Sequence, residues 1–220
     1  MRIACLHTAH SNIAVFEASA RQLGLADDAL HHDVRADLLA AAEQAGMVTP
    51  EIAAETAEAL LRLSNGADAV ILTCSTLGPV AETVTNQSAI PISRADAALA
   101  QRAVSGGGRV VVLCAVGTTV PPTTQLFTEA AKRAPACEID VRLVSGAWAL
   151  FKAGDLAGYH AAIAAAADQA YVEEATVVAL AQSSMAGAAL LVKSGPRPLT
   201  GPETALAAAV AAIRTSPQAR

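Results

Sequence analysis

One stretch of the sequence, Val70-Ile71-Leu72-Thr73-Cys74-Ser75-Thr76-Leu77, joins a short apolar run to a polar turn. The same pattern returns later in the chain as Val178-Ala179-Leu180-Ala181-Gln182-Ser183-Ser184-Met185. A second pair, Arg2-Ile3-Ala4-Cys5-Leu6 and Arg109-Val110-Val111-Val112-Leu113, matches at nearly the same separation. Unrelated apolar strands would match at arbitrary separations. We therefore interpret the chain as a duplicated unit in which Cys74 and Gln182 are equivalent.

Five short apolar runs have the length and composition of buried strands. Alanine-rich stretches of helical length lie between them, and hydrophobic residues make up 53% of the chain while aromatic residues make up only 3%. Strands that alternate with helices predict parallel sheets with helical crossovers. The sequence thus predicts an α/β fold of two pseudo-symmetric lobes, each a short parallel sheet flanked by helices. The predicted strands are 3–6, 69–72, 110–113, 141–144 and 177–180.

Capping signals and prolines indicate where helices and lobes begin. Thr49-Pro50-Glu51 and Gly154-Asp155 have the residue types that open helices. We expect a first lobe over residues 1–96, a second lobe over 97–202, and a C-terminal helix within 203–220 that joins the first lobe. Open parallel sheets bind ligands at the carboxyl ends of their strands, so we expect an active site in a cleft between the lobes.

Charge and hydropathy patterning exclude several classes of protein. The formal net charge is −5, and no block of like charges indicates binding to nucleic acid or to an anionic membrane. The apolar run that starts at Ile3 meets His7 too early for a signal-peptide core, and the other apolar runs are too short to cross a bilayer. We expect a cytoplasmic protein that acts on small molecules, with a homo-oligomer as an open alternative.

Cys74 is the first candidate for a catalytic residue. It follows a predicted buried strand, and its polar neighbours include Ser75 and Thr76, whose backbone amides favour a thiolate and bind carboxylates. An arbitrary cysteine is more often a small buried hydrophobic residue. We assign that packing role to Cys5 and Cys137. Cys114 also ends a predicted strand, but Ala115 and Val116 follow it, so it is a weaker candidate.

In each predicted lobe, a turn with hydroxyl-bearing residues follows the first strand. In the second lobe, Thr118 and Thr119 are expected to contact a substrate carboxylate, whereas Thr123 and Thr124 belong to a helix start. In the first lobe, Ser11 is the expected counterpart of Thr118. His7 or His10 would then serve as an acid or base, although a surface histidine without function is the alternative. We retain His7 and Ser11 among the candidate contacts.

Two other patterns do not lead to a metal or a cofactor. His31-His32-Asp33 places its donor groups side by side without a clear third or fourth ligand, and we interpret it as the end of a strand. Gly106-Gly107-Gly108 precedes a strand, which is the wrong order for a phosphate-binding loop. We also interpret Asp155 as a helix cap. No metal site and no cofactor are expected.

Taken in order along the chain, these motifs resemble the aspartate/glutamate/hydantoin racemase superfamily of cofactor-independent, two-lobed α/β enzymes. The resemblance implies a small carboxylate substrate and a catalytic role for Cys74 as the first-lobe cysteine. It also implies that six hydroxyl residues hold the carboxylate or carbonyl groups of the substrate. The motifs are Leu6-His7-Thr8, Leu72-Thr73-Cys74-Ser75, Gly117-Thr118-Thr119, Ala153-Gly154-Asp155-Leu156 and Leu180-Ala181-Gln182-Ser183-Ser184-Met185, and the hydroxyl residues are Ser75, Thr76, Thr118, Thr119, Ser183 and Ser184.

The sequence departs from this family at Gln182, where the family's racemases place a second cysteine. A glutamine amide does not exchange a proton near neutral pH, so we expect Gln182 to orient or polarise the substrate. Cys74 would then act alone, as an acid/base or as a nucleophile. A racemase or isomerase is the first expectation and a decarboxylase the second. A binding protein that keeps the site without the chemistry is the alternative from a different class.

Overall fold

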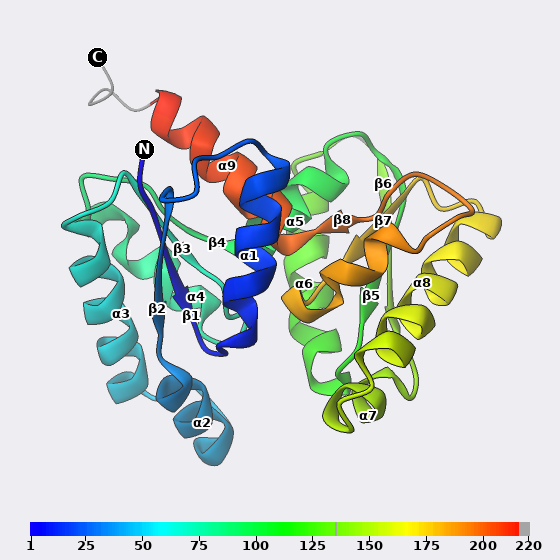
Figure 1. Ribbon diagram of the computed structural model, residues 1–220, viewed down its shortest axis with the longest axis horizontal. Helices are drawn as coiled ribbons and strands as arrows, with labels where there is room; N and C mark the ends of the chain where they lie inside the picture. Colours follow the sequence, from blue (N-terminus) through cyan, green and yellow to red (C-terminus); the bar gives the residue numbers. More distant parts are fainter. Residues whose placement is uncertain (135, 216–220) are drawn as a thin grey trace. The chain divides into compact units, whose positions relative to one another are not determined.

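The computed structural model describes residues 1–134 and 136–215, which form two compact units (Figure 1). The first unit contains Met1–Ala98 and the chain from Pro202 onwards, and the second contains Leu99–Gly201. Each unit holds one parallel sheet of four strands with helices on both faces. The expected α/β class is thereby confirmed.

The sheet of the first unit has the strand order β2-β1-β3-β4. Its two central strands, β1 (Ile3–His7) and β3 (Ala69–Leu72), are buried along their whole length. Continuous apolar runs suit such strands because helices cover both faces of a parallel sheet. The outer strands β2 (Leu30–Val34) and β4 (Ile92–Arg94) are only partly buried and carry polar residues.

Helices cover each face of this first sheet. One face packs against α1 (Ser11–Gln22) and α9 (Gly201–Thr215) in a cluster that contains Cys5 and Phe16. The opposite face packs against three helices in a cluster that contains Leu6, Leu72 and Cys74. These helices are α2 (Ala36–Ala45), α3 (Pro50–Ser64) and α4 (Gly78–Val84), and the 3-10 turn η1 (Thr85–Gln87) follows α4.

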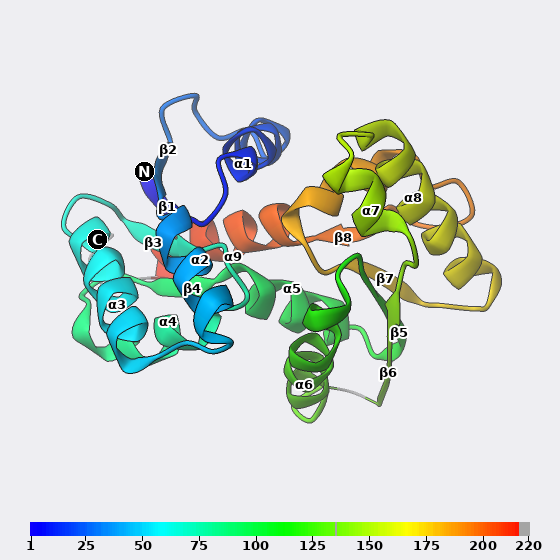
Figure 2. The same cartoon turned by 90° about the horizontal axis from the view of Figure 1, so that it is seen from below.

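The second unit repeats the first arrangement, with the strand order β6-β5-β7-β8. Its strands are β5 (Gly108–Cys114), β6 (Cys137–Leu143), β7 (Val177–Leu180) and β8 (Leu199–Thr200). Figure 2 shows α7 and α8 on one side of β5 and β7 and α6 on the other. Helix α5 (Ala95–Val104) begins in the first unit and ends in the second. The other helical elements of the second unit are α6 (Val120–Ala131), α7 (Ala147–Lys152), α8 (Leu156–Val172) and the 3-10 segments η2 (Gly117–Thr119) and η3 (Ser183–Leu190).

Local signals in the sequence explain the ends of two long helices. The Thr49 side chain accepts a hydrogen bond from the Ile52 N–H at the start of α3, and Pro50 occupies its first turn. The Asp155 side chain accepts from the Gly158 N–H at the start of α8, which confirms its expected role as a cap. Both side chains satisfy backbone donors that have no partner inside the helix.

Three expectations need adjustment. The strand expected at 141–144 begins earlier, at Cys137, and ends at Leu143. The segment His31-His32-Asp33 lies within β2 and is not merely its end. The helix expected within 203–220 extends over Gly201–Thr215, and residues 216–220 lie outside the described residues. Among residues 1–134 and 136–215, no helix is both long and apolar enough to cross a membrane.

Candidate active site

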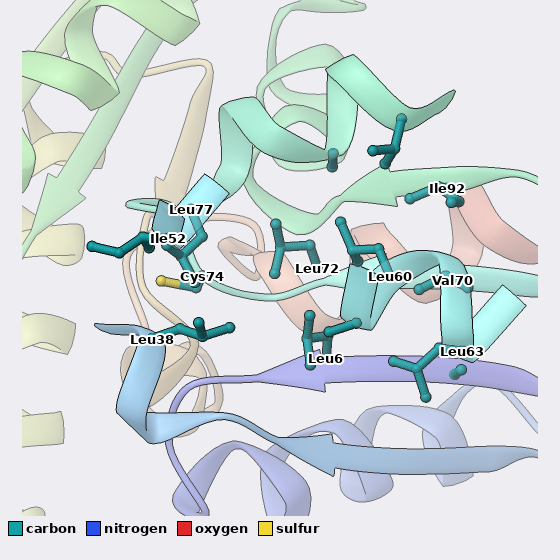
Figure 3. Close-up of a cluster of buried hydrophobic side chains, with 14 of the residues drawn as sticks. Leu6, Leu38, Ile52, Leu60, Leu63, Val70, Leu72, Cys74, Leu77 and Ile92 are labelled. Atoms are coloured by element: carbon teal, nitrogen blue, oxygen red, sulfur yellow. The ribbon is translucent and has the colours of Figure 1, made fainter. Parts of the chain in front are cut away.

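Cys74 is the second residue after β3, at the carboxyl edge of the first sheet. It belongs to the buried cluster on the α2–α4 face and keeps 8% of its surface exposed. Figure 3 shows it at one end of this cluster, with Leu38, Ile52 and Leu77 as its labelled neighbours. The thiol is thus held by apolar packing while retaining limited access to solvent.

The turn after Cys74 contains two of the predicted contact residues. Ser75 is partly buried and Thr76 is exposed, and the Gly78 N–H donates to the Ser75 carbonyl. Ser75 and Thr76 directly follow Cys74 in the sequence, so their side chains belong to the same turn. The structure therefore places the predicted thiol and two hydroxyl groups at the same edge of the sheet.

Arg94 lies beside this turn. It was not among the residues predicted from the sequence. Its guanidinium group fills the space that a side chain on Gly78 would need, at 2.5 Å from the position of a Cβ atom. It donates to Asp96 at 2.7 and 2.8 Å and to Glu82 at 2.9 Å. Two carboxylates balance its charge, and its packing against Gly78 supports the start of α4. In the sequence, the position of Arg94 at the end of a strand was the only feature that could have indicated this role.

Burial sets the protonation of the other three cysteines. It raises the pKa of Cys5 to about 12, with a further contribution from Glu17. It also raises the pKa of Cys137 and of Cys114, and hydrogen bonds from Thr123 and Thr119 oppose this effect at Cys114. These thiols are neutral near pH 7 because burial disfavours their charged form. Cys114 is fully buried, so it belongs to the core.

Gln182 occupies the position in the second unit that Cys74 occupies in the first, two residues after β7. Its side-chain oxygen accepts a hydrogen bond of 2.6 Å from the backbone N–H of Ala115, which follows the neighbouring strand β5. This bond fixes the orientation of the amide, so its NH₂ end is the donor that points away from Ala115. Gln182 is thus a positioned hydrogen-bond donor.

Thr118 and Thr119 lie in η2, at the same carboxyl edge as Gln182. The Thr119 hydroxyl donates to the Val116 carbonyl at 2.7 Å, and it also lies beside the Cys114 sulfur. Thr118 is exposed. The structure therefore gives Thr119 a role in the turn, whereas Thr118 has the accessibility expected of a substrate contact.

Ser183 and Ser184 begin η3, directly after Gln182. The Ser184 hydroxyl lies 2.9 Å from the hydroxyl of Tyr159, a fully buried residue of α8, and the Ser184 carbonyl lies 3.0 Å from His160 Nε2. Ser184 thus connects the start of η3 to α8. Tyr159 and His160 could not be predicted from the sequence, because this pairing joins distant segments.

The environment of His7 differs from the one inferred from the sequence. It is fully buried, its Nδ1 lies 2.9 Å from Thr73 Oγ1, and its Nε2 lies 2.8 Å from His32 Nδ1. Burial, and to a smaller extent the neighbouring His32, lower the pKa of His7 to about 4, so its ring is neutral near pH 7. Both ring nitrogens have protein partners, so we leave His7 out of the proposed substrate contacts. Ser11 is exposed at the start of α1.

This combination defines a class of protein: a duplicated parallel α/β unit with a thiol and a glutamine at equivalent strand ends. The sequence profile of the Asp/Glu/Hydantoin racemase family matches residues 11–210. The chain belongs to this family, and its relatives are enzymes of the racemase and isomerase type. A search of curated protein sequences found no significant match.

Solved structures with the same fold cover nearly the whole chain. Allantoin racemase from Pseudomonas fluorescens has a TM-score of 0.65 and 19% identity over 97% of this chain and 91% of that chain. A cysteine mutant of arylmalonate decarboxylase, in its sulfate-associated form, has a TM-score of 0.63 and 16% identity over 98% and 94%. A maleate isomerase mutant from Pseudomonas putida S16, with maleate, has a TM-score of 0.55 and 16% identity over 96% and 91%.

Proposed function

We propose that this protein is a cofactor-independent racemase or isomerase that acts on a small carboxylate or amino-acid-like substrate, with Cys74 as its acid/base or nucleophile. The position of Cys74 carries this proposal: this residue, which keeps 8% of its surface exposed, lies two residues after β3, in one turn with Ser75 and Thr76. Thiolates are effective bases and nucleophiles, and nearby hydroxyl and amide donors suit a carboxylate. A cytoplasmic location remains part of the proposal.

Gln182 determines what kind of chemistry the thiol can perform. An amide cannot accept and release a proton near neutral pH, so Cys74 serves one face of the substrate only. In racemisation, the Cys74 thiolate takes the α-proton and leaves the electron pair on the substrate as an enolate. Water then protonates the opposite face, and the resulting hydroxide takes the thiol proton. In isomerisation, the thiolate adds to a double bond and leaves again after rotation.

The substrate contacts follow from accessibility. Ser75, Thr76, Thr118 and Ser183 are the hydroxyl residues that we propose to bind the carboxylate or carbonyl groups, with Ser11 as a further contact. Thr119 and Ser184 already hold neighbouring parts of the protein, so they position these turns. The amide NH₂ of Gln182 completes the set as a donor that polarises the substrate.

A decarboxylase is the second candidate, because one thiol is sufficient for that reaction. After carbon dioxide leaves, the electron pair remains on the α-carbon and the Cys74 thiol delivers a proton to one face. The similarity to the fold of an arylmalonate decarboxylase supports the inclusion of malonates among the substrates to be tested. The third candidate is a protein that binds carboxylates without turnover.

The proposal is tested by turnover of amino acids, hydantoins, maleate and arylmalonates in deuterated water. Deuterium at the α-carbon of the opposite enantiomer identifies racemisation, and carbon dioxide release identifies decarboxylation. We expect Cys74→Ala and Cys74→Ser to lower turnover by a factor of about 100 or more. Cys137→Ser, a substitution of a partly buried cysteine in β6, is the matched control and should retain turnover.

Two results would contradict the proposal. Unchanged turnover in both Cys74 variants would remove Cys74 from the mechanism, and tight carboxylate binding without turnover would identify a binding protein. Gln182→Cys provides a further arm, because it restores a thiol at the second position. In a racemase, this variant should increase deuterium exchange at the α-carbon that occurs with inversion, relative to exchange that occurs with retention.

A further inference from the structure

We propose that Cys5, His7 and His32 form a binding site for a divalent transition-metal ion of the zinc class. The proposal is independent of the function proposed for Cys74. It concerns the α1 face of the first sheet, whereas Cys74 belongs to the cluster on the opposite face.

The topology of the sheet brings these three residues together. Cys5 and His7 alternate with Leu6 along β1, so their side chains point to the same face of the sheet. His32 lies on the neighbouring strand β2, where it is the direct register partner of Cys5. One donor atom from each of the three residues lies within 4.8 Å of the other two. The fold thus gives His32 two neighbouring donor residues, Cys5 and His7, that the spacing of His31-His32-Asp33 did not indicate.

The donor atoms suit a specific class of metal. A thiolate and two imidazoles favour zinc, cobalt or copper over magnesium and calcium, which prefer oxygen ligands. In a tetrahedral zinc site, neighbouring donors are about 3.4–3.6 Å apart, as zinc–nitrogen and zinc–sulfur bond lengths require. His7 Nε2 and His32 Nδ1 are 2.8 Å apart, so the two rings need to separate by about half an ångström to bind the ion.

The outer partners of both histidines are already those of a metal site. Metal-binding histidines usually donate their second ring N–H to a carboxylate or another acceptor, which fixes the ring. His32 Nε2 lies 2.9 Å from Glu17 Oε1, and His7 Nδ1 lies 2.9 Å from Thr73 Oγ1. With both outer nitrogens protonated, the lone pairs of His7 Nε2 and His32 Nδ1 are available to the metal. The Thr73 hydroxyl can then donate to the Leu6 carbonyl, 3.2 Å away.

Charge and access also fit this assignment. Metal binding breaks the S–H bond of Cys5 and forms a sulfur–metal bond, and the proton leaves to solvent. The Cys5 thiolate and the Glu17 carboxylate together balance the two positive charges of the ion, which makes burial of the site favourable. Cys5 and His7 are fully buried, but the side chains of His32 and Glu17 are 12% and 27% exposed. The ion can therefore enter from the side of His32 and Glu17.

The bound ion would connect β1, β2 and, through Glu17, α1. Through His7 it would also fix Thr73, the residue that precedes Cys74. We therefore infer a stabilising role for the ion, at a site that also supports the strand end carrying Cys74.

The test is a titration of the full-length, chelator-treated protein with Co²⁺. We expect one equivalent to bind, with the visible bands of tetrahedral cobalt and a near-ultraviolet thiolate-to-cobalt charge-transfer band. Cys5→Ser should lose the charge-transfer band, whereas Cys137→Ser and Cys74→Ser should retain it. The two controls distinguish Cys5 from two other thiols of the chain and separate this proposal from the mechanism at Cys74.

Two further variants keep the test decisive if Cys5→Ser does not fold. His32→Gln, at a partly exposed position, should abolish stoichiometric binding while the circular dichroism spectrum stays unchanged. Glu17→Gln should weaken binding by about 10- to 100-fold and retain the charge-transfer band. Absence of saturable one-equivalent binding to the folded wild-type protein would overturn the proposal, as would a charge-transfer band that survives in folded Cys5→Ser.

Discussion

At the scale of single residues, the same position after a strand carries two different kinds of side chain. Cys74 and Gln182 both lie two residues beyond a fully or largely buried central strand, β3 or β7. The Gln182 oxygen is held by the Ala115 N–H, so its orientation is fixed by a backbone that belongs to the neighbouring strand end. Cys74 is held by apolar packing instead. In the proposed mechanism the thiol is the acid/base or nucleophile, and the amide is a fixed donor.

Gly78 is a second position where one residue type is required. We expect Gly78→Ala to lower the free energy of unfolding by about 1–3 kcal/mol, because its Cβ would overlap the Arg94 guanidinium group. Arg94 cannot move without disturbing its bonds to Asp96 and Glu82. Chemical denaturation measures the change. Gly66→Ala is the control, since no atom lies within 4 Å of its Cβ position, and equal losses in the two variants would contradict this explanation.

At the scale of elements, the buried central strands were predictable, whereas among the outer strands only part of β6 was predicted. The runs 69–72 and 177–180 coincide with β3 and β7, because helices on both faces require continuous apolar sequence. β2 has the sequence Leu-His-His-Asp-Val and is partly exposed, so hydropathy gave no signal for it. The register of β2 against β1 then decides which histidine meets Cys5. A sequence pattern cannot supply that register.

The outer strand β6 provides a prediction that depends on pH. Hydrogen bonds and charge from Arg142, and then from Arg109, hold the pKa of Asp140 below its usual value. A lowered folded-state pKa stabilises the protein at neutral pH, and this contribution is lost as the pH falls through that value. We expect Asp140→Asn to be less stable than wild type at pH 7 by about 1 kcal/mol or less, because the Asp140 side chain is 31% exposed and solvent screens the pairs.

The difference between Asp140→Asn and wild type should shrink as the pH is lowered below about 4, where the carboxylate of the unfolded chain also becomes protonated. Urea denaturation at a series of pH values measures this difference. Glu43→Gln, at an exposed position in α2, should change stability by less than about 0.5 kcal/mol throughout. A constant difference across the pH range would contradict the assignment to Asp140.

At the scale of the whole chain, the sequence repeat corresponds to two sheets with the same strand order. This order, with the family profile over residues 11–210, explains why the sequence was sufficient to predict the fold class. The candidate site was predictable only in part. Residues in turns after strands, such as Cys74 and Thr118, followed from spacing. Tyr159 and Arg94 were not predicted, and His32 was interpreted only as part of a strand end, because their contacts join segments that are distant in sequence.

We propose that Cys74 is the catalytic thiol, and alkylation by iodoacetamide is the sharpest test of that role. Peptide mass spectrometry follows modification of each cysteine while turnover is measured on the same samples, with and without substrate. We predict that activity falls in proportion to modification of Cys74, that substrate slows this modification, and that Cys137 reacts without effect on turnover. Full modification of Cys74 with retained turnover would contradict the claim.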